Sequence, residues 1–279
     1  MSYKIVMDSC GELTEEMRAS GLFESVPFEI EVGTRHITDD ESFDRNEFLK
    51  YVREAPECPK SACPPAGRFL QAFCCEAERV YAVTVSEKVS GSYNSALVGK
   101  DLYEEEYGKK QIHVFNSCSA SVGETLTALK IMECEEKGMS FEETIGTVEA
   151  YIRGQHVYAA LGSIETFRKT GRLSGIKAIL ATTLNIKPVI GATTDGKVRM
   201  IGQVRGTGRA LEKLAAALLE EVSEPEKKVL AIAHCNAPEH AETIRDLVSK
   251  GAAFQKIVVV ETSGLSSMYV ENGGVIAAV

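Results

Sequence analysis

Short apolar runs alternate with longer amphipathic segments along this chain, and that alternation restricts its fold more than any other feature. The apolar runs cover residues 3–7, 26–32, 80–85 and 111–115, and a helical pattern covers residues 123–137. Apolar runs of strand length that alternate with helical segments are typical of βαβ units with a largely parallel sheet. The pattern therefore predicts an α/β fold.

The pattern changes near residue 157, where a second α/β lobe is expected to begin. A hairpin is predicted around Asp195-Gly196, because this dipeptide favours a tight turn between strands. The remaining elements predicted for this half are a strand at 157–161, a helix at 164–170, a glycine turn, a helix ending before Pro188, the hairpin strands 188–192 and 198–204, a helix at 208–222, a strand at 229–234, a helix at 238–250 and a strand at 257–261. We expect an N-terminal α/β/α lobe with a mainly parallel sheet over residues 1–155 and a second α/β lobe over residues 156–279.

Length and charge exclude several classes of partner. The chain has 279 residues, more than one average domain, and its net charge of −9 comes from 31 basic and 40 acidic side chains. Nucleic acids and anionic membrane surfaces require clustered Lys and Arg, so we expect no nucleic-acid partner and at most transient membrane contact. With neither an export signal nor an apolar stretch of about 18 residues, the expected location is the cytoplasm.

The cysteines and histidines predict neither a metal nor a cofactor. Eight cysteines lack paired C-x-x-C spacing, and five histidines form no H-x-x-x-H cluster, so we expect reduced thiols. Cys74-Cys75 can be read as a redox pair or as packed thiols. The second interpretation is favoured because residues 69–79 look helical and a reactive thiol needs an electropositive setting.

Familiar catalytic motifs are missing. The sequence contains no G-x-x-x-x-G-K-[ST] phosphate cradle and no G-x-S-x-G nucleophile turn, and Gly206-Thr207-Gly208 lacks the third glycine of a dinucleotide fingerprint. Asp39-Asp40-Glu41 is interpreted as a solvated loop, since acids that transfer protons need burial. We assign no catalytic residue.

A hydroxyl-rich turn, Ser90-Gly91-Ser92-Tyr93-Asn94-Ser95-Ala96, follows the apolar run at 80–85. It has two interpretations: a serine N-cap for the next helix, or a site where free N–H groups and hydroxyls hold a carboxylate or phosphate. The polar segments Asp8-Ser9, 86–95 and 116–119 each follow a predicted strand. Since ligands in open α/β sheets collect at the carboxyl ends of strands, all three are expected at one edge.

Several sequence blocks resemble the DegV family of bacterial fatty-acid-binding proteins, also called FakB. Ser90 to Ala96 is similar to that family's SGTYQSA turn, Phe167 to Ser174 to its LKKGGRIS segment, and Leu184 to Val189 to its LNIKPI element. The other matching blocks are 4–10, 26–28, 44–48, 59–64 and 204–207. The resemblance covers nearly the whole chain, in the family's order and spacing.

The resemblance implies two α/β lobes with a ligand between them. In the family, an apolar tunnel encloses one long-chain fatty acid, whose carboxylate is presented to a separate ATP-dependent fatty-acid kinase, and the carrier itself is not an enzyme. The residues that would meet the carboxylate are Ser61, Ser90, Gly91 and Ser92. Arg172 and Arg205 match family arginines at the site rim or the kinase-docking surface, although each can equally form a surface or interlobe ion pair.

The chain departs from the family pattern near its end and beside Ser61. Tyr269 stands where the family has the histidine of its HTGPG loop, and Glu271-Asn272 replaces Gly-Pro. A carboxylate at Glu271 would repel a bound carboxylate unless it is protonated or turned away. Cys63 replaces a usual Gln, and Lys60 is a candidate compensating charge.

Two other functions therefore stay open beside the fatty-acid carrier. One is an enzyme or sensor of this fold that acts on another small acidic metabolite, with Tyr269 or Lys60 as proton donor. The other is a binding module whose pocket has been lost while its partner surface remains. An apolar tunnel between the lobes favours the carrier, a short polar pocket favours the enzyme or sensor, and a blocked pocket favours the third function.

Overall fold

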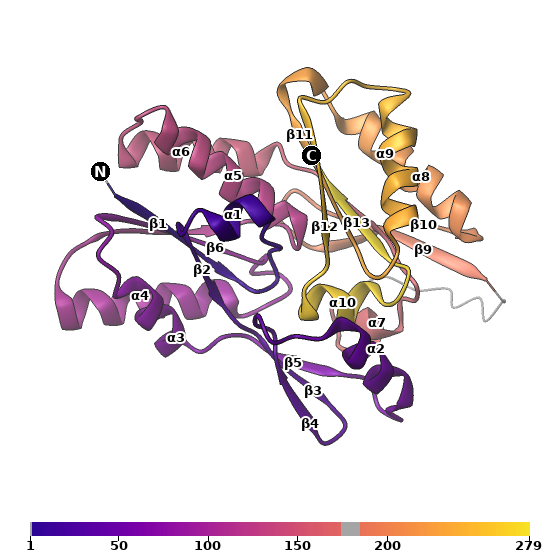
Figure 1. The fold of residues 1–279 in the computed structure, drawn as a ribbon, viewed down its shortest axis with the longest axis horizontal. Coiled ribbons are helices and arrows are strands. Elements are labelled where there is room, and N and C mark those ends of the chain that lie inside the picture. Colours follow the sequence, from indigo (N-terminus) through magenta and orange to yellow (C-terminus); the bar gives the residue numbers. More distant parts are fainter. Residues whose placement is uncertain (1, 174–184) are drawn as a thin grey trace.

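The computed structural model describes residues 2–173 and 185–279 (Figure 1). The strands are β1 (Tyr3–Asp8), β2 (Phe23–Val26), β3 (Glu29–Val32), β4 (Arg35–Thr38), β5 (Lys60–Ala62), β6 (Arg79–Thr84), β7 (Gln111–Asn116), β8 (Val157–Ala160), β9 (Ile186–Ala192), β10 (Val198–Arg205), β11 (Val229–His234), β12 (Lys256–Glu261) and β13 (Val275–Ala278). The helices are α1 (Glu15–Ala19), α2 (Arg45–Glu54), α3 (Ala66–Phe73), α4 (Ser92–Tyr107), α5 (Val122–Glu136), α6 (Phe141–Arg153), α7 (Glu165–Lys169), α8 (Thr207–Glu221), the 3-10 helix Pro225–Lys227, α9 (Pro238–Ser249) and α10 (Gly264–Val270).

The first sheet is parallel throughout, in the order β2-β1-β6-β7. Helices α3 and α4 pack on one face and α5 and α6 on the other, each pair around its own buried core (Figure 1). The Ser140 hydroxyl accepts a hydrogen bond from the Glu143 N–H and caps the start of α6. The predicted α/β/α arrangement of this half is confirmed.

A small antiparallel sheet, in the order β4-β3-β5, lies beside the first one. It corrects the prediction of one strand over residues 26–32. β2 ends at Val26 in the first sheet, and β3 begins at Glu29 in the small one. Pro27 separates them because proline has no N–H to donate to a ladder.

The second sheet has the order β10-β9-β8-β13-β11-β12 and is antiparallel except where β11 pairs with β12. Helices α8 and α9 cover its outer face, while α5 packs against the opposite face. The predicted hairpin is confirmed as β9 and β10, with Gly196 at φ 83° in the turn. The helix predicted before Pro188 falls largely on residues 174–184, outside the described residues, and Ile186 already belongs to β9.

The helical placement of Cys74 and Cys75 was wrong. α3 ends at Phe73, so both cysteines lie in the connection to β6. The Lys110 ammonium donates to the Cys75 carbonyl at 2.6 Å and lies 3.6 Å from its sulfur. Cys75 therefore sits beside a fixed positive charge, which the expected helix would not have supplied.

One continuous apolar core joins the two larger sheets. It includes Phe28 and Leu126 from the first half and Ala159, Ile190 and Leu265 from the second, all buried. The strands of the first sheet end by residue 116 and those of the second begin at residue 157, with α5 and α6 between them. A lobe boundary at residue 155 stays a prediction. Among residues 2–173 and 185–279, no helix combines the length and apolar character needed to span a bilayer.

Candidate ligand-binding site

The three polar turns after β1, β6 and β7 meet at one edge of the first sheet, as predicted. The Val85 N–H donates to the Asp8 carboxylate at 3.0 Å, and the Ser86 N–H donates to the Ser119 carbonyl at 2.9 Å. Parallel pairing of β1, β6 and β7 brings their carboxyl ends together and aims the turns at the second sheet.

A cavity lies between this edge and the inner face of the second sheet. Its empty volume is about 860 Å³, part of it open to solvent. The wall is mainly apolar and includes Cys10, Phe28, Val85, Val89, Ala120, Val157, Ala159, Phe167, Ile190, Ala192, Val198, Leu265, Val270 and Ile276. Both halves of the chain contribute, so the cavity exists only when the two sheets are packed together.

Arg172 marks a polar end of this cavity. Its Nε donates to the Val89 carbonyl at 3.1 Å, and its Nη1 donates to the Thr170 carbonyl at 2.9 Å. These bonds hold the guanidinium beside Ser90, and both residues line the cavity. Within the described residues, these two bonds occupy two of the five N–H groups of the guanidinium.

Tyr269 and Ser61 complete the polar end. The Tyr269 hydroxyl donates to Thr170 Oγ1 at 3.4 Å, and its ring lies 4.7 Å from the ring of Phe167, centroid to centroid. Ser61 comes from β5 and also lines the cavity. The structure thus brings Ser61, Ser90, Arg172 and Tyr269 to one cavity.

Gly91 and Ser92 are placed differently from their two neighbours in the turn. Gly91 occupies the N-cap position of α4, and the serine one residue earlier supplies the cap bond: the Ser90 hydroxyl accepts from the Ser92 N–H at 3.2 Å. Ser92 is fully buried, and its hydroxyl donates to Asp8 Oδ2 at 2.5 Å. Neither residue is among those that line the cavity.

Lys60, Cys63 and Arg205 also lie outside the cavity lining. Lys60 and Arg205 are exposed, at the start of β5 and the end of β10 respectively. Cys63 Sγ packs against Gly91, where an added Cβ would lie 3.2 Å from the sulfur. Arg205 and Arg172 are therefore not parts of one rim of this cavity.

Glu271 and Asn272 line a second, more polar pocket formed with α7 and the segment 49–59. The Thr166 hydroxyl donates to Glu271 at 3.3 Å, and burial raises the pKa of the Glu271 carboxyl. Glu271 is absent from the lining of the apolar cavity. The repulsion anticipated between Glu271 and a bound carboxylate has no structural basis inside that cavity.

Two buried acids that sequence reasoning missed hold the start of α10. Asp39 is 3 % exposed and accepts from the N–H groups of Gly264 (2.6 Å) and Leu265 (2.9 Å) and from the Ser9 hydroxyl (2.9 Å). Burial raises its pKa to about 6, so the solvated-loop interpretation was wrong for this residue. The charged neighbours Asp40 and Glu41 gave no signal for it in the sequence.

Glu12 is the second of these acids. One of its oxygens accepts from the Ser121 hydroxyl at 2.6 Å, and the other accepts from the Ser263 N–H at 3.4 Å. Burial raises the pKa of Glu12 to about 7. Asp39 and Glu12 thus tie the first 40 residues to the helix that carries Leu265 and Tyr269 into the cavity.

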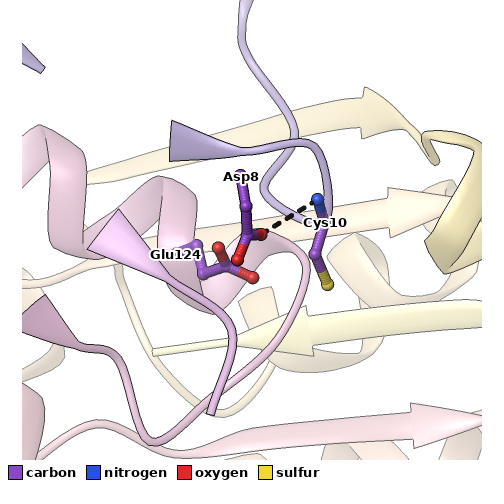
Figure 2. A group of neighbouring side chains, drawn as sticks. All are labelled: Asp8, Cys10 and Glu124. Carbon is purple, nitrogen blue, oxygen red and sulfur yellow. Dashed lines mark hydrogen bonds between the residues drawn. The ribbon is translucent and has the colours of Figure 1, made fainter. Parts of the chain in front are cut away.

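A third acidic group lies behind the cavity wall, where Asp8, Cys10 and Glu124 converge with their functional atoms within 4.8 Å of one another (Figure 2). All three are buried, and Cys10 also lines the cavity. Burial and the neighbouring carboxylates raise the pKa of the Cys10 thiol, which keeps it protonated.

Fold and site together define an α/β binding protein with an apolar cavity between its two larger sheets, and this cavity has a polar end. The chain belongs to the DegV family, whose family model matches residues 2–279. A DegV domain-containing protein of Streptococcus pyogenes serotype M1 is 31% identical over 281 residues, covering 99% of this chain and 98% of its own length.

Two solved structures show the same fold over the full chain. A DegV family protein from Ruminococcus gnavus, solved with vaccenic acid, is 48% identical with a TM-score of 0.97, and 100% of each chain is covered. The Streptococcus pneumoniae Fatty Acid Kinase (Fak) B3 protein, loaded with linoleic acid, is 28% identical with a TM-score of 0.85, covering 100% of this chain and 99% of its own. The predicted DegV family and two-lobed α/β fold are confirmed.

Proposed function

We propose that this protein binds one long-chain fatty acid in the apolar cavity, with the carboxylate at the end formed by Ser61, Ser90, Arg172 and Tyr269. The observation that carries the proposal is the contrast between the mainly apolar wall and these polar side chains, beside which the cavity is also lined by Ser119, Ser121, Ser266 and Tyr158. Related chains of the same fold from R. gnavus and S. pneumoniae were solved with vaccenic and linoleic acid.

The apolar wall would supply most of the affinity. Burying methylene groups contributes about 0.8 kcal/mol each, which amounts to roughly 10 kcal/mol for a sixteen-carbon chain before the costs of binding. The polar end then has to orient the carboxylate and offset its loss of water. The hydroxyls of Ser61 and Ser90 and the Arg172 guanidinium are suitable donors for this, since a carboxylate accepts several hydrogen bonds and bonds most strongly with charged partners. The Tyr269 hydroxyl would join them by exchanging its long bond to Thr170 for one to the ligand.

The carboxylate would be presented to a separate ATP-dependent fatty-acid kinase that forms the acyl phosphate. One observation supports this step: the S. pneumoniae chain is named as part of a fatty acid kinase. The present sequence has no phosphate cradle of its own, so the nucleotide would come with the partner. Lys60 and Arg205, exposed and outside the cavity lining, are proposed as docking residues.

Native mass spectrometry of the protein purified from a bacterial host tests fatty-acid binding directly. A mass shift of one fatty acid, with the acid identified after organic extraction, is the expected result. A protein that stays empty after incubation with myristic, palmitic and oleic acids would overturn the proposal and favour another acidic metabolite as ligand.

Ala159→Trp tests whether the cavity is the binding site. Ala159 lies on β8, is 7 % exposed and lines the cavity, so an indole ring there would take the space of several methylene groups. We expect palmitic acid to bind at least a hundredfold more weakly, because displacing about four methylenes costs about 3 kcal/mol. Decanoic acid provides the matched control, since its shorter chain should lose far less affinity.

A further inference from the structure

Asp8 connects the segments that shape the polar end of the cavity. Its Oδ1 accepts from the Cys10 N–H at 3.2 Å, and its Oδ2 accepts from the Val85 N–H at 3.0 Å and the Ser92 hydroxyl at 2.5 Å. Cys10 and Val85 line the cavity, and Ser92 ends the turn that contains Ser90. One carboxylate at the end of β1 therefore fixes two points of the cavity wall and the end of the turn that contains Ser90.

Glu124 approaches Asp8 from α5, and Figure 2 shows the two carboxyl groups side by side. Both residues are fully buried. Within residues 2–173 and 185–279, neither oxygen of Glu124 forms a hydrogen bond of normal geometry and neither acid forms an ion pair, although the nearby Cys10 thiol acts to lower the pKa of Glu124. Asp8, by contrast, receives all three donors.

Two buried carboxyl groups this close do not both stay ionised without a cation, because their repulsion adds to the cost of burying each charge. The three donors around Asp8 favour its charged form, so the shared proton belongs on Glu124. Burial and the neighbouring Asp8 charge both raise the pKa of Glu124 well above its ordinary value. Glu12 adds further negative charge nearby and acts in the same direction.

We propose that Glu124 is a neutral carboxylic acid that donates its proton to Asp8, and that this pair is the positioning element for the ligand's carboxylate end. Asp8 and Glu124 are positioning residues, since neither lines the cavity. The Asp8–Glu124 pair thereby carries one negative charge instead of two. The effect on ligand affinity rests on the fatty-acid-binding function, whereas the protonation of Glu124 does not.

Infrared difference spectroscopy in heavy water tests the protonation. The spectrum of the wild type minus that of Glu124→Gln, at neutral pH, should show the C=O stretching band of one protonated carboxyl group, above the amide I region. Glu136→Gln, an exposed acid on the same helix, is the matched control and should show no such band. A difference spectrum without this band would overturn the proposal. The proposal would also fail if native mass spectrometry found one bound metal ion in the wild type and none in Glu124→Gln.

Fatty-acid affinity tests the positioning. Glu124→Gln restores a donor to Asp8 and should bind within about twofold of wild type, whereas Glu124→Leu provides none and should bind about tenfold more weakly. Wild-type affinity should fall at alkaline pH as Glu124 ionises, and Glu124→Gln should lack this fall. If Glu124→Leu does not fold, the pH dependence of affinity in the wild type and in Glu124→Gln is compared instead. Identical pH profiles of these two proteins would overturn the positioning role.

Discussion

The turn after β6 and the start of α10 both line the cavity, and each is held by a buried carboxylate. Asp8 holds Val85 and Ser92, while Asp39 holds Gly264 and Leu265. Both acids accept from backbone N–H groups and from one serine hydroxyl. The two walls of the cavity are thus built on the same principle: one anion fixes a segment by gathering its donors.

The surroundings of the two anions differ. Asp39 faces donors, the charge of Asp8 has only a minor effect on it, and its pKa rises to about 6. Asp8 shares its space with Glu124, whose oxygens form no hydrogen bond of normal geometry within the described residues and whose pKa is raised well above its ordinary value by burial and by the Asp8 charge. The comparison teaches that burial alone does not decide whether an acid is charged. The protonation state of a buried acid depends on how many hydrogen-bond donors and how many other acids surround it.

Glu12→Gln should produce the largest change, seen in the pH dependence of stability. The pKa of Glu12 is about 7 in the folded protein against 4.5 ordinarily. A raised pKa contributes fully to the stability of the fold at a pH below the ordinary pKa of 4.5, and this contribution is lost as the pH rises through 7. The free energy of unfolding should therefore fall by roughly 3 kcal/mol from this group, between about pH 5 and about pH 8.

Urea unfolding across that pH range measures the effect, and Glu12→Gln should flatten the slope. Glu15→Gln, an exposed acid on α1, is the control and should keep the wild-type slope. Equal slopes for wild type and Glu12→Gln would mean that Glu12 titrates normally.

Asp39→Ala should lower the free energy of unfolding by about 2 kcal/mol at neutral pH, because the N–H groups of Gly264 and Leu265 lose their acceptor. Asp40→Ala, at the neighbouring exposed position, should change it by less than about 0.5 kcal/mol. Urea unfolding of the two variants compares them directly. Similar losses in both would show that the α10 wall is not held by Asp39.

Ser92→Ala should cost about 1.5 kcal/mol of stability, since it removes a buried hydroxyl that donates to the charged Asp8. The loss should appear in thermal unfolding without any ligand present. An unchanged unfolding temperature would contradict the role of Ser92 as a support for the turn.

Ser90→Ala should have the smallest effect, and this effect should be mainly on fatty-acid affinity. Ser90 lines the cavity and has no bond to Asp8, but its hydroxyl accepts from the Ser92 N–H at 3.2 Å, so fatty-acid affinity should fall about fivefold, by the loss of one hydrogen bond, and stability by no more than about 1 kcal/mol. Titration calorimetry with palmitic acid measures it, with Ser249→Ala on the far helix α9 as the control. A large loss of stability would mean that the two serines of the turn are not distinct in role.

Elements with a regular apolar period were predictable. β11, for example, occupies the predicted residues 229–234, and β9 and β10 differ from prediction by at most two residues at each end. β13 and α10 were missed because each is short. β13 has four apolar residues after a glycine pair, and α10 is built largely of small residues without a helical period.

The site was predictable as far as local chemistry reaches. Ser61, Ser90, Arg172 and Tyr269 come from sequence blocks that resemble the family, and they do line one cavity. Side-chain direction was not predictable: Ser90 faces the cavity and Ser92, two residues on, faces Asp8. Nor was the burial of Asp39, which depends on packing against α10 more than 200 residues later.

β13 also imposes an order on synthesis. The four-stranded sheet has all of its strands once Asn116 has been made, but the strand between β8 and β11 ends only at Ala278 (Figure 1). During synthesis, β8 and β11 therefore keep unpaired edges until residues 275–278 have left the ribosome. Because Ile276 of that strand lines the cavity, a nascent chain has no pocket to load, and the ligand can enter only after translation has passed this strand.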